Sequence, residues 1–159
     1  MVGVVLCSWC LVLCSPSSGA ADGSGASRLF APGANLCKLV STTKLAAATG
    51  FKLPTPVSGR HFCTWQVSPG VWRDSVQLSV RSGLGRQGVE STMSGERRAT
   101  VTTVTVPGAS YASLLTAGYR GMIRDWVAAV YPEGAVFVAL TAPGLTPGRA
   151  IAALMAVVS

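Results

Sequence analysis

The sequence predicts an α+β domain in which an antiparallel sheet of about five strands carries an N-terminal and a C-terminal helix. Two observations lead to this class. Stretches with alternating apolar and polar residues are joined by short turns, which favours hairpins over βαβ units. Helical patterns stand near the two ends of the expected domain, residues 36–159. The chain has 159 residues, and what remains after a leader has the usual size of one domain, so a single domain is expected.

The first helix is expected over residues 43–48. A Ser or Thr side chain can accept a hydrogen bond from the free N–H groups of a first helical turn, and Ser41 or Thr42 stands where this cap is needed. Gly50 follows the last turn, where glycine takes the left-handed conformation at little cost. Lys44 should lie on the exposed side of this helix.

The first hairpin is predicted from alternation. Residues 61–67 and 76–81 alternate on either side of a turn at 68–70, so we expect these two strands to pair. Cys63 and Trp65 are two residues apart and therefore share one face of the first strand.

Three further strands are expected. Residues 82–98, rich in glycine and serine, are assigned to an exposed loop or an irregular helix, after which β-branched residues return at 99–106. Residues 126–131 and 135–141 form a second hairpin, because the Pro-Glu-Gly between them suits a type I turn.

The last helix begins at Thr146, which can cap it, with Pro147 in the first position, where the missing N–H has no partner to lose. It is too short to cross a bilayer and should close over the sheet. Its apolar face is predicted from residues that recur at helical spacing: Ile151, Leu154, Met155 and Val158.

Residues 1–20 are predicted to be a signal peptide or lipoprotein leader. The apolar run at 2–14 is shorter than the ~18 residues needed to span a bilayer, and small residues at 18–20 mark a candidate cleavage site. Residues 21–35 are rich in Ser, Gly and Ala and are expected to be a flexible linker. The alternative is a buried N-terminal strand or helix, since no Lys or Arg precedes the apolar run.

The chain has 5 cysteines, of which Cys7, Cys10 and Cys14 lie in the predicted leader. Cys37 and Cys63 remain as a pair in the body. In an exported chain an isolated pair is most simply a disulfide, and closing a loop of this length contributes about 3.5 kcal/mol in the chain-entropy model. A pair of free buried thiols is the alternative.

The chain carries a formal charge of +7. Arginine binds phosphate and carboxylate groups through two parallel hydrogen bonds, so an anionic lipid or cell-wall polymer is a candidate partner. The alternative is an ordinary solvated face. A nucleic acid partner is not expected, because no recognised binding motif is present and export is predicted. The candidate contacts lie in and beside the second strand: Arg81, Arg86, Arg97 and Arg98.

We predict no enzymatic activity, cofactor or metal. Residues 83–88 match G-x-G-x-x-G without the helix and parallel strand that a dinucleotide site needs. Residues 108–112 fall one glycine short of a serine-hydrolase elbow, and His61, the only histidine, precedes Ser110 in the chain. An unrecognised hydrolase remains the third hypothesis, through acids that could converge in space: Asp74, Asp125 and Glu133.

Four short motifs are Cys-Lys-Leu-Val at 37–40, Ala-Ala-Thr-Gly at 47–50, Cys-Thr-Trp at 63–65 and Val-Pro-Gly-Ala at 106–109. Together with the second hairpin and the last helix, they make residues 35–158 resemble a family of actinobacterial secreted lipoproteins of uncharacterised function. The resemblance implies a Mog1/PsbP-like α+β sandwich with the two body cysteines paired.

The same resemblance makes Cys14 the candidate lipid acceptor, although Leu13 stands where the family has a small residue. Lipid anchoring to the outer face of the cell membrane and simple secretion both remain open. The leading functional hypothesis is a non-catalytic binding or accessory protein of the cell envelope, with an apolar or anionic ligand in a cleft between sheet and helix. The alternative is an extracellular interaction domain that docks on a membrane protein.

Overall fold

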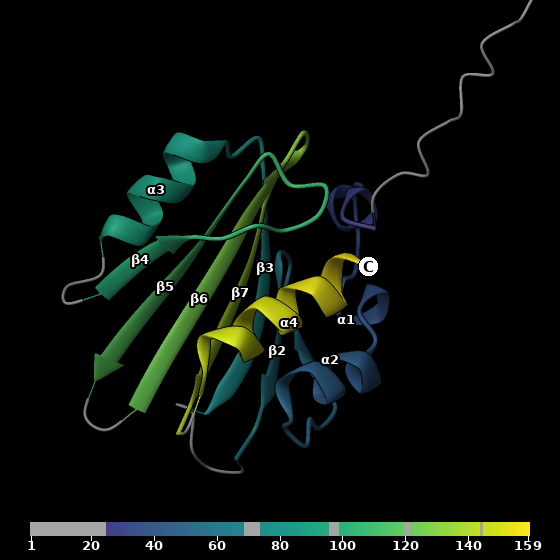
Figure 1. Cartoon of the computed structure of the whole chain (residues 1–159). Coiled ribbons are helices and arrows are strands. Elements are labelled where there is room, and N and C mark those ends of the chain that lie inside the picture. Colours follow the sequence, from purple (N-terminus) through teal and green to yellow (C-terminus); the bar gives the residue numbers. More distant parts are fainter. Residues whose placement is uncertain (1–24, 69–73, 96–98, 120–121, 144) are drawn as a thin grey trace, which may run out of the picture.

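The computed structural model describes residues 25–68, 74–95, 99–119, 122–143 and 145–159. Three predicted features lie outside the described residues: the leader with Cys14, and the arginines Arg97 and Arg98. In the described part, the chain forms an antiparallel sheet with helices on both of its faces (Figure 1).

The sheet has seven strands in the spatial order β1-β2-β3-β7-β6-β5-β4, and neighbouring strands are antiparallel. The predicted α+β class is confirmed, but the sheet is larger than the five strands expected. Both predicted hairpins are present, as β2 with β3 and β6 with β7. The strands are β1 (Val57–Ser58), β2 (Phe62–Gln66), β3 (Ser75–Ser82), β4 (Ala99–Thr103), β5 (Tyr111–Tyr119), β6 (Met122–Tyr131) and β7 (Gly134–Ala142).

Two strands, β1 and β5, were not predicted from the sequence, for different reasons. β1 has only 2 residues, which is too few to show alternation. β5 lies between β4 and β6, and its residues 112–115 are all buried. A strand that is covered on both faces has no polar side to alternate with its apolar side, so its signal is lost.

Helices from the two ends of the described chain cover one face of the sheet (Figure 1). Cys63 and Trp65 share this face, as predicted, and both are fully buried. The Trp65 indole Nε1 donates a hydrogen bond to the Thr42 hydroxyl at 3.1 Å, which ties α2 to β2. These elements are the 3-10 helix η1 (Ser27–Phe30), α1 (Leu36–Leu39), α2 (Thr42–Thr49) and α4 (Pro147–Val158).

The helix boundaries follow the predicted signals. The Ser41 hydroxyl accepts a hydrogen bond from the Lys44 backbone N–H at 3.3 Å, and Gly50 has a φ of 71°. Thr146 precedes α4 and Pro147 is its first residue, yet the Thr146 side chain makes no capping hydrogen bond. The start of α4 is therefore confirmed, whereas the expected side-chain cap is absent.

The buried face of α4 is rotated from the predicted one. Leu154 and Val158 are buried as expected, but Ile151 and Met155 are only partly buried. Alanine has a small side chain, so an alanine stripe lets the helix lie close to the strands while larger residues fill the margins. The fully buried side chains of α4 are Ala150, Ala153, Leu154 and Val157.

The start of the described chain packs against the end of α4. Ala26 and Leu29 are buried. The Arg28 guanidinium donates a hydrogen bond to the Ser159 carbonyl oxygen at 2.9 Å, a favourable interaction for a cation at the end of a helix. Within the expected linker at 21–35, the residues from 25 onward therefore pack on the domain, because Leu29 belongs to its core.

The opposite face of the sheet is only half covered. Helix α3 (Arg86–Ser94) lies across β4, β5 and β6 (Figure 1). The stretch at 82–98, expected to be an exposed loop or an irregular helix, thus contains a regular helix of 9 residues. Its inner side chains Val89 and Met93 are buried against Leu115 of β5 and Ala128 of β6. In the described part of the chain, no helix covers this face of β2 and β3.

Candidate binding site

The open half of the sheet is the outward surface of β2 and β3, which α3 leaves uncovered, together with the adjoining outward side chains of β7, of which Phe137 is buried and also packs into the cluster under α3. Along β3, alternation places Val76, Leu78 and Val80 in the core. Residues that pair directly across antiparallel strands share a face, so the register with β2 and β7 identifies the other members. We define the open half by its outward side chains: Phe62, Thr64, Gln66, Gln77, Ser79, Arg81, Phe137, Ala139 and Thr141.

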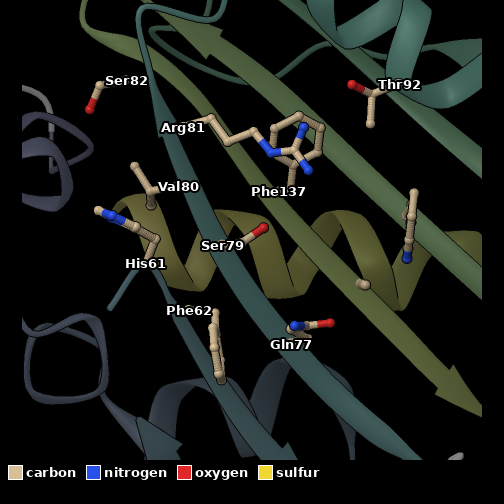
Figure 2. Close-up of a pocket in the computed structure, with 11 residues that line it drawn as sticks. His61, Phe62, Gln77, Ser79, Val80, Arg81, Ser82, Thr92 and Phe137 are labelled. Atoms are coloured by element: carbon tan, nitrogen blue, oxygen red, sulfur yellow. The ribbon is translucent and has the colours of Figure 1, made fainter. Parts of the chain in front are cut away.

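A hollow of about 620 Å³ lies over the open half and reaches Thr92 of α3 (Figure 2). This volume falls within the ~300–1,000 Å³ typical of ligand pockets. Two cross-strand rows contribute to the lining, Phe62, Ser79 and Phe137 in one and Gln77, Ala139 and Trp126 in the other.

Three aromatic rings give the hollow its apolar character. Phe62 is 39% exposed although it lies on a strand. The Arg81 guanidinium carbon is 5.4 Å from the centre of the Phe137 ring, and Figure 2 shows the two groups together. Arg124 lies 4.8 Å from the centre of the Trp126 ring. A cation over an aromatic face is attracted by the ring quadrupole, so the ring helps to hold Arg81 at the hollow.

Polar groups of the lining are free for a ligand. In the described part of the chain, the Gln77 amide and the Ser79 hydroxyl make no hydrogen bond. Figure 2 shows both side chains at the hollow. The Thr92 hydroxyl is instead committed, because it donates to the Gly88 carbonyl oxygen at 2.8 Å. Gln77 can donate and accept, and Ser79 can do the same.

The lining contains no Asp or Glu. Arg81 is exposed and has no ion pair among the described residues. An exposed guanidinium over an aromatic ring, without a neighbouring carboxylate, favours an anionic group on the ligand. The hollow therefore combines apolar stacking surface, hydrogen-bonding groups and one positive charge.

Two of the four predicted arginines, Arg81 and Arg86, lie within the described residues, and of these Arg81 lines the hollow. Arg86 begins α3, where its Nε is 2.7 Å from a Glu90 carboxylate oxygen and its guanidinium lies 4.7 Å from the centre of the Tyr111 ring. The hydrogen bond to Glu90 raises the pKa of Arg86. Arg86 is therefore paired and is not part of the lining.

The serine and histidine considered for a hydrolase are far apart. Ser110 precedes β5 and His61 precedes β2, with β3, β7 and β6 between those strands. Four strand spacings of about 4.8 Å place them roughly 19 Å apart. The Ser110 hydroxyl also donates to the Val130 carbonyl oxygen at 3.1 Å. These two residues do not form a Ser–His pair.

The three candidate acids do not converge. Asp74 precedes β3, whereas Glu133 lies in the β6–β7 turn beside the other end of β3. Asp125 is fully buried on β6, where one carboxylate oxygen accepts a hydrogen bond from the Thr116 hydroxyl at 2.7 Å. Among the described residues there is also no group of His, Cys, Asp and Glu that could hold a metal ion.

The glycine motif at 83–88 joins β3 to α3, but the strand that follows the helix is the antiparallel edge strand β4. A dinucleotide fingerprint needs a parallel neighbour, which brings the phosphate to the strand ends. Gly83, with a φ of 71°, allows the turn out of β3. The motif thus supports a turn and a helix start.

The predicted disulfide between Cys37 and Cys63 is confirmed, with an S–S distance of 2.03 Å. It joins α1 to β2 on the covered side of the sheet. Because Cys63 follows Phe62 directly, the bond also fixes the strand whose outward side carries this ring. Sequence reasoning missed Phe62 and Phe137 as candidate contacts, although an aromatic residue on the polar side of an alternating strand was a usable signal for Phe62.

No family model, curated protein or solved structure matches the chain. None of the helices described here is both long and apolar enough to span a bilayer.

Proposed function

We propose that the protein is a non-catalytic binding or accessory protein of the cell envelope, whose ligand combines a flat apolar part with a negative charge. The hollow on the open half holds this ligand. The observation that carries the proposal is Arg81, exposed over Phe137 in a lining without acids. Stacking on the exposed Phe62 ring and hydrogen bonds to Gln77 and Ser79 would orient the bound molecule.

The proposal includes export. Residues 1–20 supply a leader pattern, and the Cys37–Cys63 disulfide agrees with an oxidising compartment. Secretion and anchoring through Cys14 remain the two routes to the cell surface, and membership in the lipoprotein family that the motifs resemble is part of the same proposal. A protein anchored to the membrane contacts only molecules close to it, so its ligand would be a component of the envelope.

Native mass spectrometry of protein purified from its own host tests this function. Wild-type protein should carry an anionic molecule, and Arg81→Gln should lose most of it. Arg149→Gln is a matched control, because Arg149 also lies over a phenylalanine, 6.0 Å from the centre of the Phe51 ring, but belongs to α4 on the covered face. If Arg81→Gln and Arg149→Gln carried the bound molecule at equal occupancy, the hollow would not be the binding site.

A second candidate function, docking on a membrane protein, is favoured by the edge strand β4. All but one of the residues of Ala99–Thr103 are exposed, Val101 is 47% exposed, and the strand contains neither a charge nor a proline. An edge of this kind can pair with a strand from another chain. A stoichiometric polypeptide in the same mass spectra would support this function instead.

A further inference from the structure

A second hollow, of about 460 Å³, lies between the 29–36 segment and the β1–β2 turn. The central residues of that turn are Arg60 and His61, since the Gly59 N–H donates to the Phe62 carbonyl oxygen at 3.0 Å. The lining contains the apolar side chains of Phe30 and Pro32, the amide of Asn35 and the guanidinium of Arg60. Like the first hollow, it contains no acid.

The two hollows adjoin each other. His61, Val80 and Ser82 line both. The Val80 N–H donates to the His61 carbonyl oxygen at 3.2 Å, so the shared wall is held by the sheet. Figure 2 shows these three residues at the end of β3, beside Arg81. Because Val80 and Ser82 alternate with Arg81 along β3, their side chains lie on the opposite side of that strand. The surface therefore passes from the open half around the end of β2, past the β1–β2 turn, to the segment that follows η1.

Each hollow has its own cation. Arg81 belongs to the first and Arg60 to the second, and neither has an ion pair among the described residues. Two unpaired cations along one track match a ligand whose negative charges repeat. A ligand with a single charge would engage only one of them.

The continuous surface formed by the two hollows is open to solvent and has polar groups between its aromatic rings. Phe62 and Phe30 supply apolar contact, while Gln77 and Ser79 supply hydrogen-bonding groups. Asn35 can offer only its amide N–H groups, because its Oδ1 accepts a hydrogen bond from the Lys38 N–H at 3.3 Å. A fatty acyl chain is best held by an enclosed apolar cavity, since exposed amides and hydroxyls gain nothing from it. A sugar ring instead presents C–H groups to an aromatic face and hydroxyl groups to amides.

From these observations we infer that the two hollows form one extended groove for an anionic polysaccharide chain, with one acidic group at Arg81 and another at Arg60. This inference rests on the proposed function and adds the class and length of the ligand. The chain contacts the aromatic rings through its sugar faces, and its carboxylate, sulfate or phosphate groups accept hydrogen bonds from the two guanidinium groups.

The test measures affinity against ligand length by isothermal titration calorimetry at low salt. The probes are oligogalacturonates and heparin fragments graded from two to ten sugars, with maltooligosaccharides of the same lengths as neutral controls. For at least one acidic series, affinity should rise by about tenfold or more with length and then level off once both cations are engaged. Neutral chains should bind more weakly at every length.

The variants separate this inference from the proposed function. Arg60→Gln should remove the gain with length and leave the affinity for the shortest chain unchanged, whereas Arg81→Gln should weaken every chain. Arg149→Gln should behave as wild type. Length-independent binding, or no effect of Arg60→Gln, would overturn the extended groove while the single hollow stands. Absence of binding to both acidic series, with Arg81-dependent binding to phosphatidylglycerol vesicles, would replace the polysaccharide with a lipid.

Discussion

The two halves of the outer sheet face are built from the same antiparallel strands but differ in what lies over them. Under α3, the outward residues Leu115 and Ala128 are fully buried and pack against Val89 and Met93. On the open half, the outward residue Gln77 of β3 is exposed. Apolar outward positions need a cover to leave water, whereas polar outward positions do not. The uncovered half is therefore free for binding because its stability does not depend on a cover.

The largest effect on the free energy of unfolding is expected when apolar volume is removed from the covered half. Met93 is 1% exposed, so Met93→Ala should lower the free energy of unfolding by about 2–5 kcal/mol through lost burial and a cavity. Gln77→Ala on the open half should change it by less than about 0.5 kcal/mol. Urea denaturation compares the two. Similar losses at both positions would show that the open half also carries the stability of the sheet.

Removing the Cys37–Cys63 disulfide tests whether β2, which carries Phe62 of the open half, depends on its link to α1. Replacing Cys37 and Cys63 together by serine should cost about 2–4 kcal/mol, because the unfolded chain regains the freedom of the closed loop. Hydrogen exchange should increase first in α1, β1 and β2. If protection were instead lost equally in β5 and β6, the bond would act on the whole domain and not on the open half.

A buried tyrosine on the sheet face covered by α4 makes the stability of that face depend on pH. Tyr131 is 3% exposed, its hydroxyl has no hydrogen-bond partner among the described residues, and desolvation raises its pKa to about 12. In the unfolded chain the group titrates near pH 10. Between these values the unfolded state has lost the proton and the folded state retains it, so stability falls as pH rises from 10 toward 12. Denaturation of wild type and Tyr131→Phe at several pH values checks this, since the variant should lack that part of the slope.

The smallest expected effect on stability belongs to the arginines. Arg81→Gln should change the free energy of unfolding by less than about 0.5 kcal/mol, yet it should weaken ligand binding and its dependence on salt. Arg86→Gln should leave binding intact, because Arg86 is paired with Glu90 outside the hollow. Thermal melts and binding at two salt concentrations distinguish the pair. Equal binding losses in both variants would extend the site onto α3.

Much of the fold was predictable from local patterns. The caps around α2, the β2–β3 and β6–β7 hairpins and the start of α4 follow from residues that lie next to one another in the chain. β5 was not predictable, since burial on both faces removes alternation. The face of α4 was also misjudged, because large apolar residues dominate the pattern while the small side chains of Ala150 and Ala153 are the ones fully buried.

Of the candidate site, the sequence by itself determined one cation, Arg81, and the disulfide that fixes β2, because strand alternation and an isolated cysteine pair are local or countable signals. Only the tertiary structure decided that Phe62 and Phe137 share one hollow with Arg81, that Arg86 is paired elsewhere, and that a second hollow adjoins the first. These depend on strand order and on where α3 lies. β3 pairs with β7 rather than with its successor in the chain, and such long-range pairing leaves no pattern in neighbouring residues.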